Sequence, residues 1–212
     1  AGTSLMLEGN RLVQIQACRF TRAAHVACFL RNSVNATITG VIVTDSRSGI
    51  QAHEGCQFVT IQGCVVDYTL TANLYANYLI RGASYCTISG CVSRGNREGL
   101  HIHDVVGLNT EGNVLQGNSV YGAQAYGIIF DGEAPRGNSV IGGSVRDISG
   151  SPGHGVSLSP NAGRSLVSSV FVHGCAVGLS NEGGDSLVIG NHLLGNTIPL
   201  LTAGGMALGN LV

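Results

Sequence analysis

A recurrent pattern around glycine constrains the fold of this chain more than any other feature. An anchor position recurs at intervals of 21 to 32 residues, and glycine stands directly before seven of the eight anchors. The anchors are Cys18, Val41, Cys64, Cys91, Asn118, Gly143, Cys175 and Asn196. A period of this length is typical of a solenoid, in which each repeat packs only on its neighbours.

Apolar residues keep a constant spacing from the anchors. Two positions after the anchor, seven of eight residues are apolar, and three positions before it all eight are aliphatic. The aliphatic row is Ile15, Ile38, Ile61, Ile88, Leu115, Val140, Val172 and Leu193. Because strand side chains alternate between two faces, the three-residue step to the anchor predicts a break between two strands. The glycine in that break tolerates the left-handed backbone angles of a sharp corner.

A third short strand is expected later in each repeat. It begins at a Gly-aliphatic pair such as Gly99-Leu100 or Gly127-Ile128, and in the last repeat we expect it at Gly205-Met206. Three short strands per repeat predict an all-β fold, a right-handed parallel β-helix of about eight turns. We expect residues 1–212 to be a single domain and a segment of a larger chain, because no capping helix is visible over the open strand edges.

The Gly-x-Ile and Asn-x-Ile-x-Gly-Asn style of this repeat resembles the pectate-lyase-like β-helix superfamily. That superfamily includes polysaccharide lyases, mannuronan epimerases, NosD-type repeat proteins and phage tailspikes. The resemblance reaches most of the chain and implies the fold, a polysaccharide partner and an extracellular, cell-surface or virion location. The resemblance gives little information about activity, because one fold can support many functions. The chain lacks the Asp-Pro-His-Glu signature of mannuronan epimerases and has no lysine that could act as a base.

Composition excludes several other partners. The net charge of −1 gives no sequence-wide attraction to nucleic acid. Apolar runs stay far below the roughly 20 residues of a membrane span, so we expect no membrane insertion. The sequence has no phosphate-binding glycine loop and no zinc-type Cys/His spacing, so we predict no cofactor and no metal. The alternative is a metal bound by His101 and His103 with Asp104 or Asp131.

The outer face of the third strand carries the candidate site. In residues 99–104, Leu100 and Ile102 are expected to point inward, which turns His101 and His103 outward. The same register predicts an outward row of Glu8, Arg31, His53, Arg81, His103, Asp131, Ser159 and Glu182. A parallel row is predicted to contain Met6, Phe29, Gln51, Leu79, His101, Ile129, Ser157, Ser180 and Ala207. The pitch of about 4.8 Å between strands is similar to the repeat of an extended polysaccharide.

These residue types suit chemistry on an acidic sugar. Removing the proton beside a uronate carboxylate requires a general base and a cation that neutralises the carboxylate. We predict His53 or His103 as the base, Arg81 as the cation, and Asp131 as a residue that orients a histidine or acts on the sugar. The predicted substrate-binding residues are Glu8, Arg31, Gln51, His101, Asp104 and Glu182.

Three functions stay open on sequence grounds. The leading one is glycan recognition by a β-helix of tailspike or cell-surface type, and Phe29, Leu79 and Ile129 on the outer face suggest that a homotrimer partner, a loop or a further domain packs there. The second is a polysaccharide lyase or C5-epimerase. The third is a purely structural solenoid, in which the charged row forms cross-strand pairs. The inserted segment Asp67–Ala76 is the next place to look for a binding surface.

Overall fold

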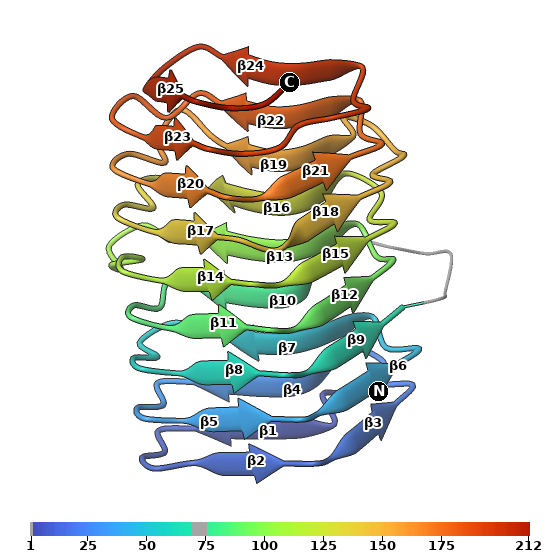
Figure 1. Cartoon of the computed structure of the whole chain (residues 1–212). Helices are drawn as coiled ribbons and strands as arrows, with labels where there is room; N and C mark the ends of the chain where they lie inside the picture. The colour runs from blue at the N-terminus through green and yellow to red at the C-terminus, as the bar shows by residue number, and fades with distance from the viewer. Residues whose placement is uncertain (1, 69–75) are drawn as a thin grey trace.

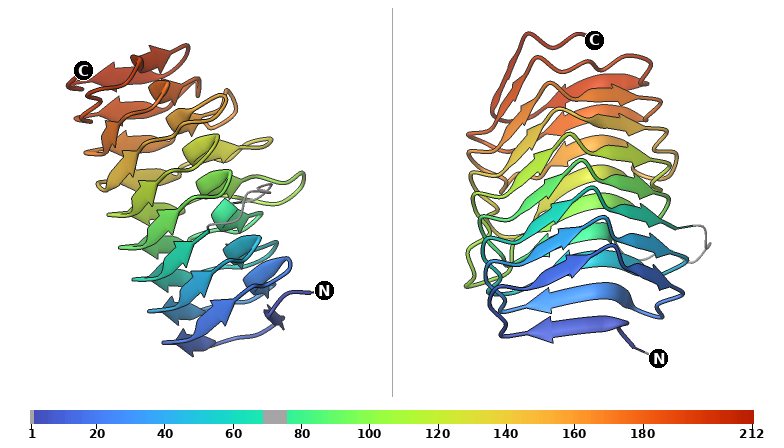
Figure 2. Two further views of the ribbon diagram at one scale, coloured as in Figure 1. Left: turned by 90° about the vertical axis from the view of Figure 1, so that its right-hand side faces the viewer. Right: turned by 60° about the horizontal axis from the view of Figure 1, so that its bottom comes forward.

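The computed structural model describes residues 2–68 and 76–212, and in those ranges it contains 25 strands and no helix. It therefore offers no helix able to span a membrane within the described residues. The chain coils into a right-handed solenoid of stacked turns, with the two termini at opposite ends (Figures 1 and 2). The predicted all-β parallel β-helix is thus confirmed. The segment Asp67–Ala76 falls mostly on residues 69–75, which lie outside the described residues.

Three parallel sheets run along the solenoid, and the first seven turns contribute one strand to each of them, whereas the last two contribute strands to the first and second sheets only (Figure 1). The first sheet contains β1 (Leu5–Glu8), β4 (Val26–Arg31), β7 (Ser48–Ala52), β10 (Ala76–Arg81), β13 (Glu98–His103), β16 (Tyr126–Asp131), β19 (His154–Leu158), β22 (Val177–Asn181) and β24 (Ile198–Thr202). Its nine strands give about nine turns, one more than the sequence predicts.

The other two sheets consist of three-residue strands. The second sheet contains β2 (Gln14–Gln16), β5 (Thr37–Thr39), β8 (Thr60–Gln62), β11 (Thr87–Ser89), β14 (Val114–Gln116), β17 (Ser139–Ile141), β20 (Leu166–Ser168), β23 (Leu187–Ile189) and β25 (Met206–Leu208). The third sheet contains β3 (Arg19–Thr21), β6 (Ile42–Thr44), β9 (Val65–Asp67), β12 (Val92–Arg94), β15 (Ser119–Tyr121), β18 (Ser144–Arg146) and β21 (Phe171–His173).

The predicted aliphatic row forms the core of the second sheet. Ile15 pairs with Ile38, Ile38 with Ile61, and Ile61 with Ile88, all of them buried. Each side chain meets its copy in the next turn, and burying one aliphatic side chain of this size stabilises a fold by about 1.5–3 kcal/mol. The stack of equivalent side chains therefore holds the turns in register.

The predicted register is wrong from the seventh turn onward. The second-sheet row continues through Val167, Val188 and Ala207, whereas Val172 lies in the third-sheet strand β21. The two corners that flank the third-sheet strand of a turn both use left-handed residues, and glycine can occupy either one. In the seventh turn Ser169 takes the left-handed angle at the first corner, with φ 57°, and Gly174 occupies the second. Because the prediction followed the glycine, it placed the last two anchors five residues too late, at Cys175 and Asn196.

The last predicted third strand is also displaced. Met206 pairs with Leu187 of β23, so the segment at Gly205-Met206 belongs to the second sheet. The first sheet ends instead at β24, where Leu201 pairs with Ser180. The predicted strand therefore lies six residues too late, because Leu200 rather than Met206 pairs with Leu179.

Candidate functional site

The outward row on the first sheet follows the predicted register. Glu8 pairs with Arg31, Arg81 with His103, and His103 with Asp131. Leu30 and Ile80 both pair with Ala52, which places His53, one residue further on, between Arg31 and Arg81. Parallel pairing therefore brings side chains from distant parts of the sequence together at the pitch of one strand.

The parallel row is correct in its middle and wrong at its end. Gln51 lies between Phe29 and Leu79, and Leu79 pairs with His101. Ala207 is not a member, because it lies in the second sheet, and Leu201 takes its place. Ile129 is buried and Phe29 and Leu79 are half-buried, so these apolar side chains are less exposed than expected.

A hollow of about 390 Å³ lies over strands β7, β10 and β13 of the first sheet. Its lining residues are His25, Val26, Ser48, Gln51, His53, Ala76, Leu79, Arg81, Glu98, His101 and His103. Five predicted site residues are therefore brought together in one concave surface. Concave surfaces with a few convergent polar groups are the usual form of a ligand site.

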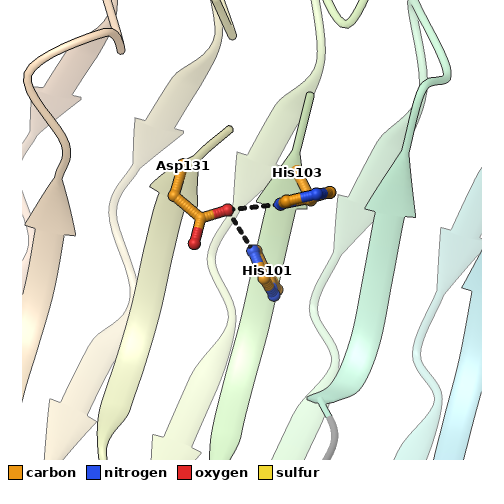
Figure 3. A group of neighbouring side chains, drawn as sticks. All are labelled: His101, His103 and Asp131. Carbon is orange, nitrogen blue, oxygen red and sulfur yellow. Dashed lines mark hydrogen bonds and ion pairs between the residues drawn. The ribbon is translucent and has the colours of Figure 1, made fainter. Parts of the chain in front are cut away.

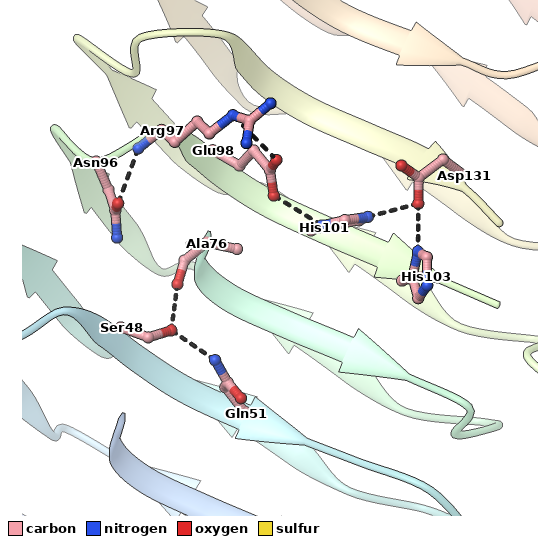
Figure 4. Close-up of polar contacts among 9 residues, drawn as sticks. All are labelled: Ser48, Gln51, Ala76, Asn96, Arg97, Glu98, His101, His103 and Asp131. Atoms are coloured by element: carbon pink, nitrogen blue, oxygen red, sulfur yellow. Dashed lines mark hydrogen bonds and ion pairs between the residues drawn. The ribbon is translucent and has the colours of Figure 1, made fainter. Parts of the chain in front are cut away.

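A cluster around Asp131 borders the hollow (Figure 3). Nε2 of His101 and Nδ1 of His103 each lie 2.6 Å from the same oxygen, Oδ1 of Asp131. On its other side, Nδ1 of His101 lies 2.7 Å from Oε2 of Glu98 (Figure 4). An ionised carboxylate can only accept, so each nitrogen of the His101 ring must carry a proton, and His101 is an imidazolium ion.

The electrostatics of the cluster agree with this assignment. Burial alone would lower the pKa of His101, but its hydrogen bonds with Asp131 and Glu98 outweigh burial and raise that pKa to about 9. Burial would likewise raise the pKa of Asp131, but hydrogen bonds from His101 and His103 hold it well below its usual range. The cluster is an ion pair in the metal-free protein at neutral pH.

The pKa of His53 is shifted in the opposite direction from that of His101. Its ring packs against Phe29, with centroids 4.5 Å apart. Burial, reinforced by the positive charge of Arg81, lowers the pKa of His53 to about 4, so the imidazole is neutral at neutral pH. The hollow thus contains one neutral and one charged histidine.

A hydrogen-bond chain selects the tautomer of His53. The hydroxyl of Ser48 donates to the carbonyl of Ala76, and Nε2 of Gln51 donates to that hydroxyl at 2.6 Å. Oε1 of Gln51 therefore faces His53 as an acceptor, 2.8 Å from its Nε2. Since Nε2 carries the proton, Nδ1 keeps a lone pair, which is what a general base requires.

Arg81 forms an ion pair with Glu54, a residue that the alternation of strand side chains did not predict. Nη1 of Arg81 lies 3.4 Å from Oε1 of Glu54, and Arg31 lies 2.9 Å from the other oxygen of Glu54. Arg31 also approaches Glu8, at 3.8 Å. Glu54 follows β7 in a turn, so the strand pattern could not place it. Glu98 was also missed, although it stands three residues before His101 on the same strand.

Four predicted binding residues lie elsewhere, and one of them is Arg31, which pairs with Glu54. Asp104 is buried after β13, and its Oδ2 accepts a hydrogen bond from the backbone of Ala134 at 2.8 Å. Glu182 accepts from the hydroxyl of Ser180 at 3.3 Å, and Glu8 lies near the N-terminal end of the row. None of these four lines the hollow over β7, β10 and β13.

Three parallel sheets wound into stacked turns define a protein of the parallel β-helix class. The chain belongs to the NosD family, whose description is "Periplasmic copper-binding protein (NosD)" and which it matches over residues 8–208. This agrees with the resemblance to the pectate-lyase-like superfamily. No curated protein matches the sequence.

Solved structures share the fold. The A-module of mannuronan C-5 epimerase AlgE4 from Azotobacter vinelandii is 13% identical with a TM-score of 0.67, over 100% of this chain and 77% of that one. The A-module of AlgE6 from the same organism is 20% identical with a TM-score of 0.59, over 79% and 44%. The periplasmic alginate epimerase AlgG is 14% identical with a TM-score of 0.52, over 87% and 50%. The chain thus spans half or less of AlgE6 and AlgG in these matches, and at such identities the likeness shows the fold alone.

Proposed function

We propose that the hollow over β7, β10 and β13 binds an acidic polysaccharide. The observation that carries this proposal is the guanidinium of Arg81 in a concave surface that also holds Gln51 and His103. A guanidinium binds a carboxylate through two parallel hydrogen bonds and keeps its charge at all physiological pH values. Gln51 and His103 add polar groups for sugar hydroxyls, and Leu79 adds an apolar surface.

The shape of the face supports an extended ligand. The first sheet continues on both sides of the hollow, and its strands recur at about 4.8 Å, which is close to the length of a sugar unit. The structural relatives include proteins named as mannuronan and alginate epimerases, which favours a uronate polymer over a neutral one. A phage-tailspike or cell-surface setting and a homotrimer remain predictions.

A finer version of the proposal is turnover by a lyase or C5-epimerase. The favouring observation is the pair of histidines with opposite charge states in one site. Nδ1 of neutral His53 would take the proton beside the carboxylate while Arg81 neutralises that carboxylate. In a lyase, the departing glycosidic oxygen would take a proton from water, because both N–H groups of His101 are already donated to Asp131 and Glu98.

Metal binding is a second candidate function. The family description names copper, and His101, His103 and Asp131 provide two imidazoles and one carboxylate within reach of one ion. Imidazole nitrogen suits copper and zinc, so the donor set fits such an ion. When bound, a metal of this kind supplies Lewis acidity to a coordinated oxygen.

We also place the chain outside the cytoplasm. The NosD family and the alginate epimerase AlgG are both described as periplasmic. A periplasmic or extracellular location is compatible with a polysaccharide ligand, whereas the narrower assignment to a cell surface or a virion stays a prediction.

A glycan screen tests the leading proposal. The protein is applied to immobilised polyuronates and to neutral polysaccharides of similar length, and bound polyuronate is then incubated with the protein. We expect retention on polyuronates only, weakening with added salt. New ultraviolet absorbance from unsaturated uronate would identify a lyase, and a changed uronate composition without chain cleavage would identify an epimerase. Equal retention on neutral and acidic glycans would contradict an acidic ligand, and no retention on either would favour a purely structural solenoid.

A further inference from the structure

We infer that Nε2 of His101, Nδ1 of His103 and Oδ1 of Asp131 form an open site for a divalent transition-metal ion, with Glu98 as its positioning residue. The inference rests on the second candidate function, metal binding, and names the atoms that would bind the ion. It does not depend on glycan binding.

The three donor atoms already surround one small volume. They all lie within 4.8 Å of one another, and both nitrogens lie 2.6 Å from the carboxylate oxygen (Figure 3). Donors that bind a tetrahedral ion at about 2.0–2.2 Å stand roughly 3.3 Å apart. Small rotations of the side chains would therefore admit an ion, which replaces the proton on Nε2 of His101 and releases it to solvent.

The backbone prepares this geometry. His101 and His103 lie on one face of β13, and Asp131 lies beside His103 on the adjacent strand β16. A site built on paired strands keeps its donors in place better than one built on loops. The three side chains are partly buried, with 13% of His101 and 33% each of His103 and Asp131 exposed, so an ion could enter from solvent.

The donor set selects the class of ion. Two imidazoles and one carboxylate suit Zn²⁺ or Cu²⁺, whereas Ca²⁺ and Mg²⁺ prefer sites made of oxygen donors. Three protein donors leave a coordination position free, as in exchangeable and catalytic sites. His101 and His103 both line the hollow, so an ion held by them would lie beside it.

Glu98 completes the arrangement without being a ligand. Its Oε2 accepts a hydrogen bond from Nδ1 of His101 at 2.7 Å, which fixes the ring and directs Nε2 toward Asp131. Arg97 lies 3.9 Å from the other oxygen of Glu98. A carboxylate behind a ligating histidine is a common second layer of metal sites, and its loss lowers metal affinity by about 10–100-fold.

Titration calorimetry with Zn²⁺ and Cu²⁺, and electron paramagnetic resonance of the Cu²⁺ form, test the assignment on the whole chain. We expect one ion per chain and a spectrum with two imidazole nitrogens. His103→Ala should lose the second nitrogen signal and bind at least about ten-fold more weakly. Glu98→Gln should weaken binding by about 10–100-fold while both nitrogens remain. His173→Ala, on the third sheet, serves as the matched control and should bind as the wild type does.

Each outcome decides between the claims. If the wild type binds an ion and His103→Ala binds it equally well with an unchanged spectrum, the ligand assignment is wrong although the metal-binding function stands. If only Glu98→Gln is unchanged, the positioning role is wrong. If the wild type binds neither ion, both the metal function and this site are wrong. Circular dichroism of each variant confirms that the fold is kept.

Discussion

His101 and Asp131 lie 2.6 Å apart on the neighbouring strands β13 and β16. With Glu98 on its other ring nitrogen, His101 is an imidazolium held between two carboxylates. The chain as a whole carries a net charge of only −1, so attraction of an acidic ligand must come from local groups. The hollow also contains the positively charged guanidinium of Arg81 and the neutral imidazole of His53.

The titration of His101 follows from this geometry. We expect its imidazole to stay protonated up to a pH of about 9 in the metal-free protein, because Asp131 and Glu98 both accept its protons. In Asp131→Asn the pKa should fall toward the ordinary value of about 6.5. Nuclear magnetic resonance of the histidine ring protons measures both values. A wild-type midpoint near 6.5 would contradict the cluster geometry.

The same ion pair should make stability depend on pH at both ends of the range. The pKa of His101 is raised on folding, so its contribution is complete below about 6.5 and is lost as the pH rises through about 9. The pKa of Asp131 is lowered, so its contribution is complete above about 3.9 and is lost as the pH falls below that value.

Urea unfolding of wild type and His101→Gln measures this dependence. We expect the variant to be less stable by about 1–3 kcal/mol at pH 6, because buried charged partners are left unpaired. The two curves should converge above pH 9. A stability difference that stays constant from pH 6 to pH 10 would mean that the charge of His101 is not responsible.

His53 should behave in the opposite way. Burial, and secondarily Arg81, lowers its pKa to about 4, so folding favours the neutral ring. Its contribution to stability is complete above about pH 6.5 and is lost as the pH falls toward 4. If His53 is a catalytic base, turnover of a polyuronate should decline on the acid side near pH 4. A decline centred near pH 6.5 would point to a different base.

Glycine near the start of the first-sheet strands is expected to be required for packing, as at Gly127 in β16. A Cβ built on Gly127 would lie 2.5 Å from the carbonyl oxygen of Gly155 in the next turn and would also clash with Val145. We therefore expect Gly127→Ala to lower the free energy of unfolding by about 1–3 kcal/mol, the usual effect of overpacking. Gly163→Ala is the matched control, because nothing lies within 4 Å of its added methyl group. Equal thermal midpoints for the two variants would refute this explanation.

Most of the fold could be predicted from the sequence because a solenoid repeats its own pattern. The row from Ile15 to Val140 stacks as predicted, and the error begins where Ser169 replaces the glycine of the corner. A left-handed serine has no clear sequence signal, whereas Gly174 at the other corner has the expected one. Pattern matching on glycine could therefore not distinguish the two corners.

The candidate site was predictable only as far as strand alternation reaches. Alternation and register placed His101, His103 and Asp131 together. They could not show that Glu54 would hold Arg81, because Glu54 lies in a turn. They also could not show that the carboxylate of Asp104 would be buried and bonded to the backbone of Ala134. These contacts depend on side-chain directions beyond the regular strand.

Polyuronate binding by two arginine variants tests the central claim most directly. Arg81 lies in the hollow and pairs with Glu54, whereas Arg94 lies on the third sheet and pairs with Asp67, so both substitutions remove one charge and one exposed ion pair. With an oligouronate in calorimetry, Arg81→Gln should bind at least about ten-fold more weakly, as expected for the loss of a charged hydrogen bond. Arg94→Gln should bind within about two-fold of wild type. Equal binding by Arg81→Gln and the wild type would contradict the assignment of this hollow as the glycan site.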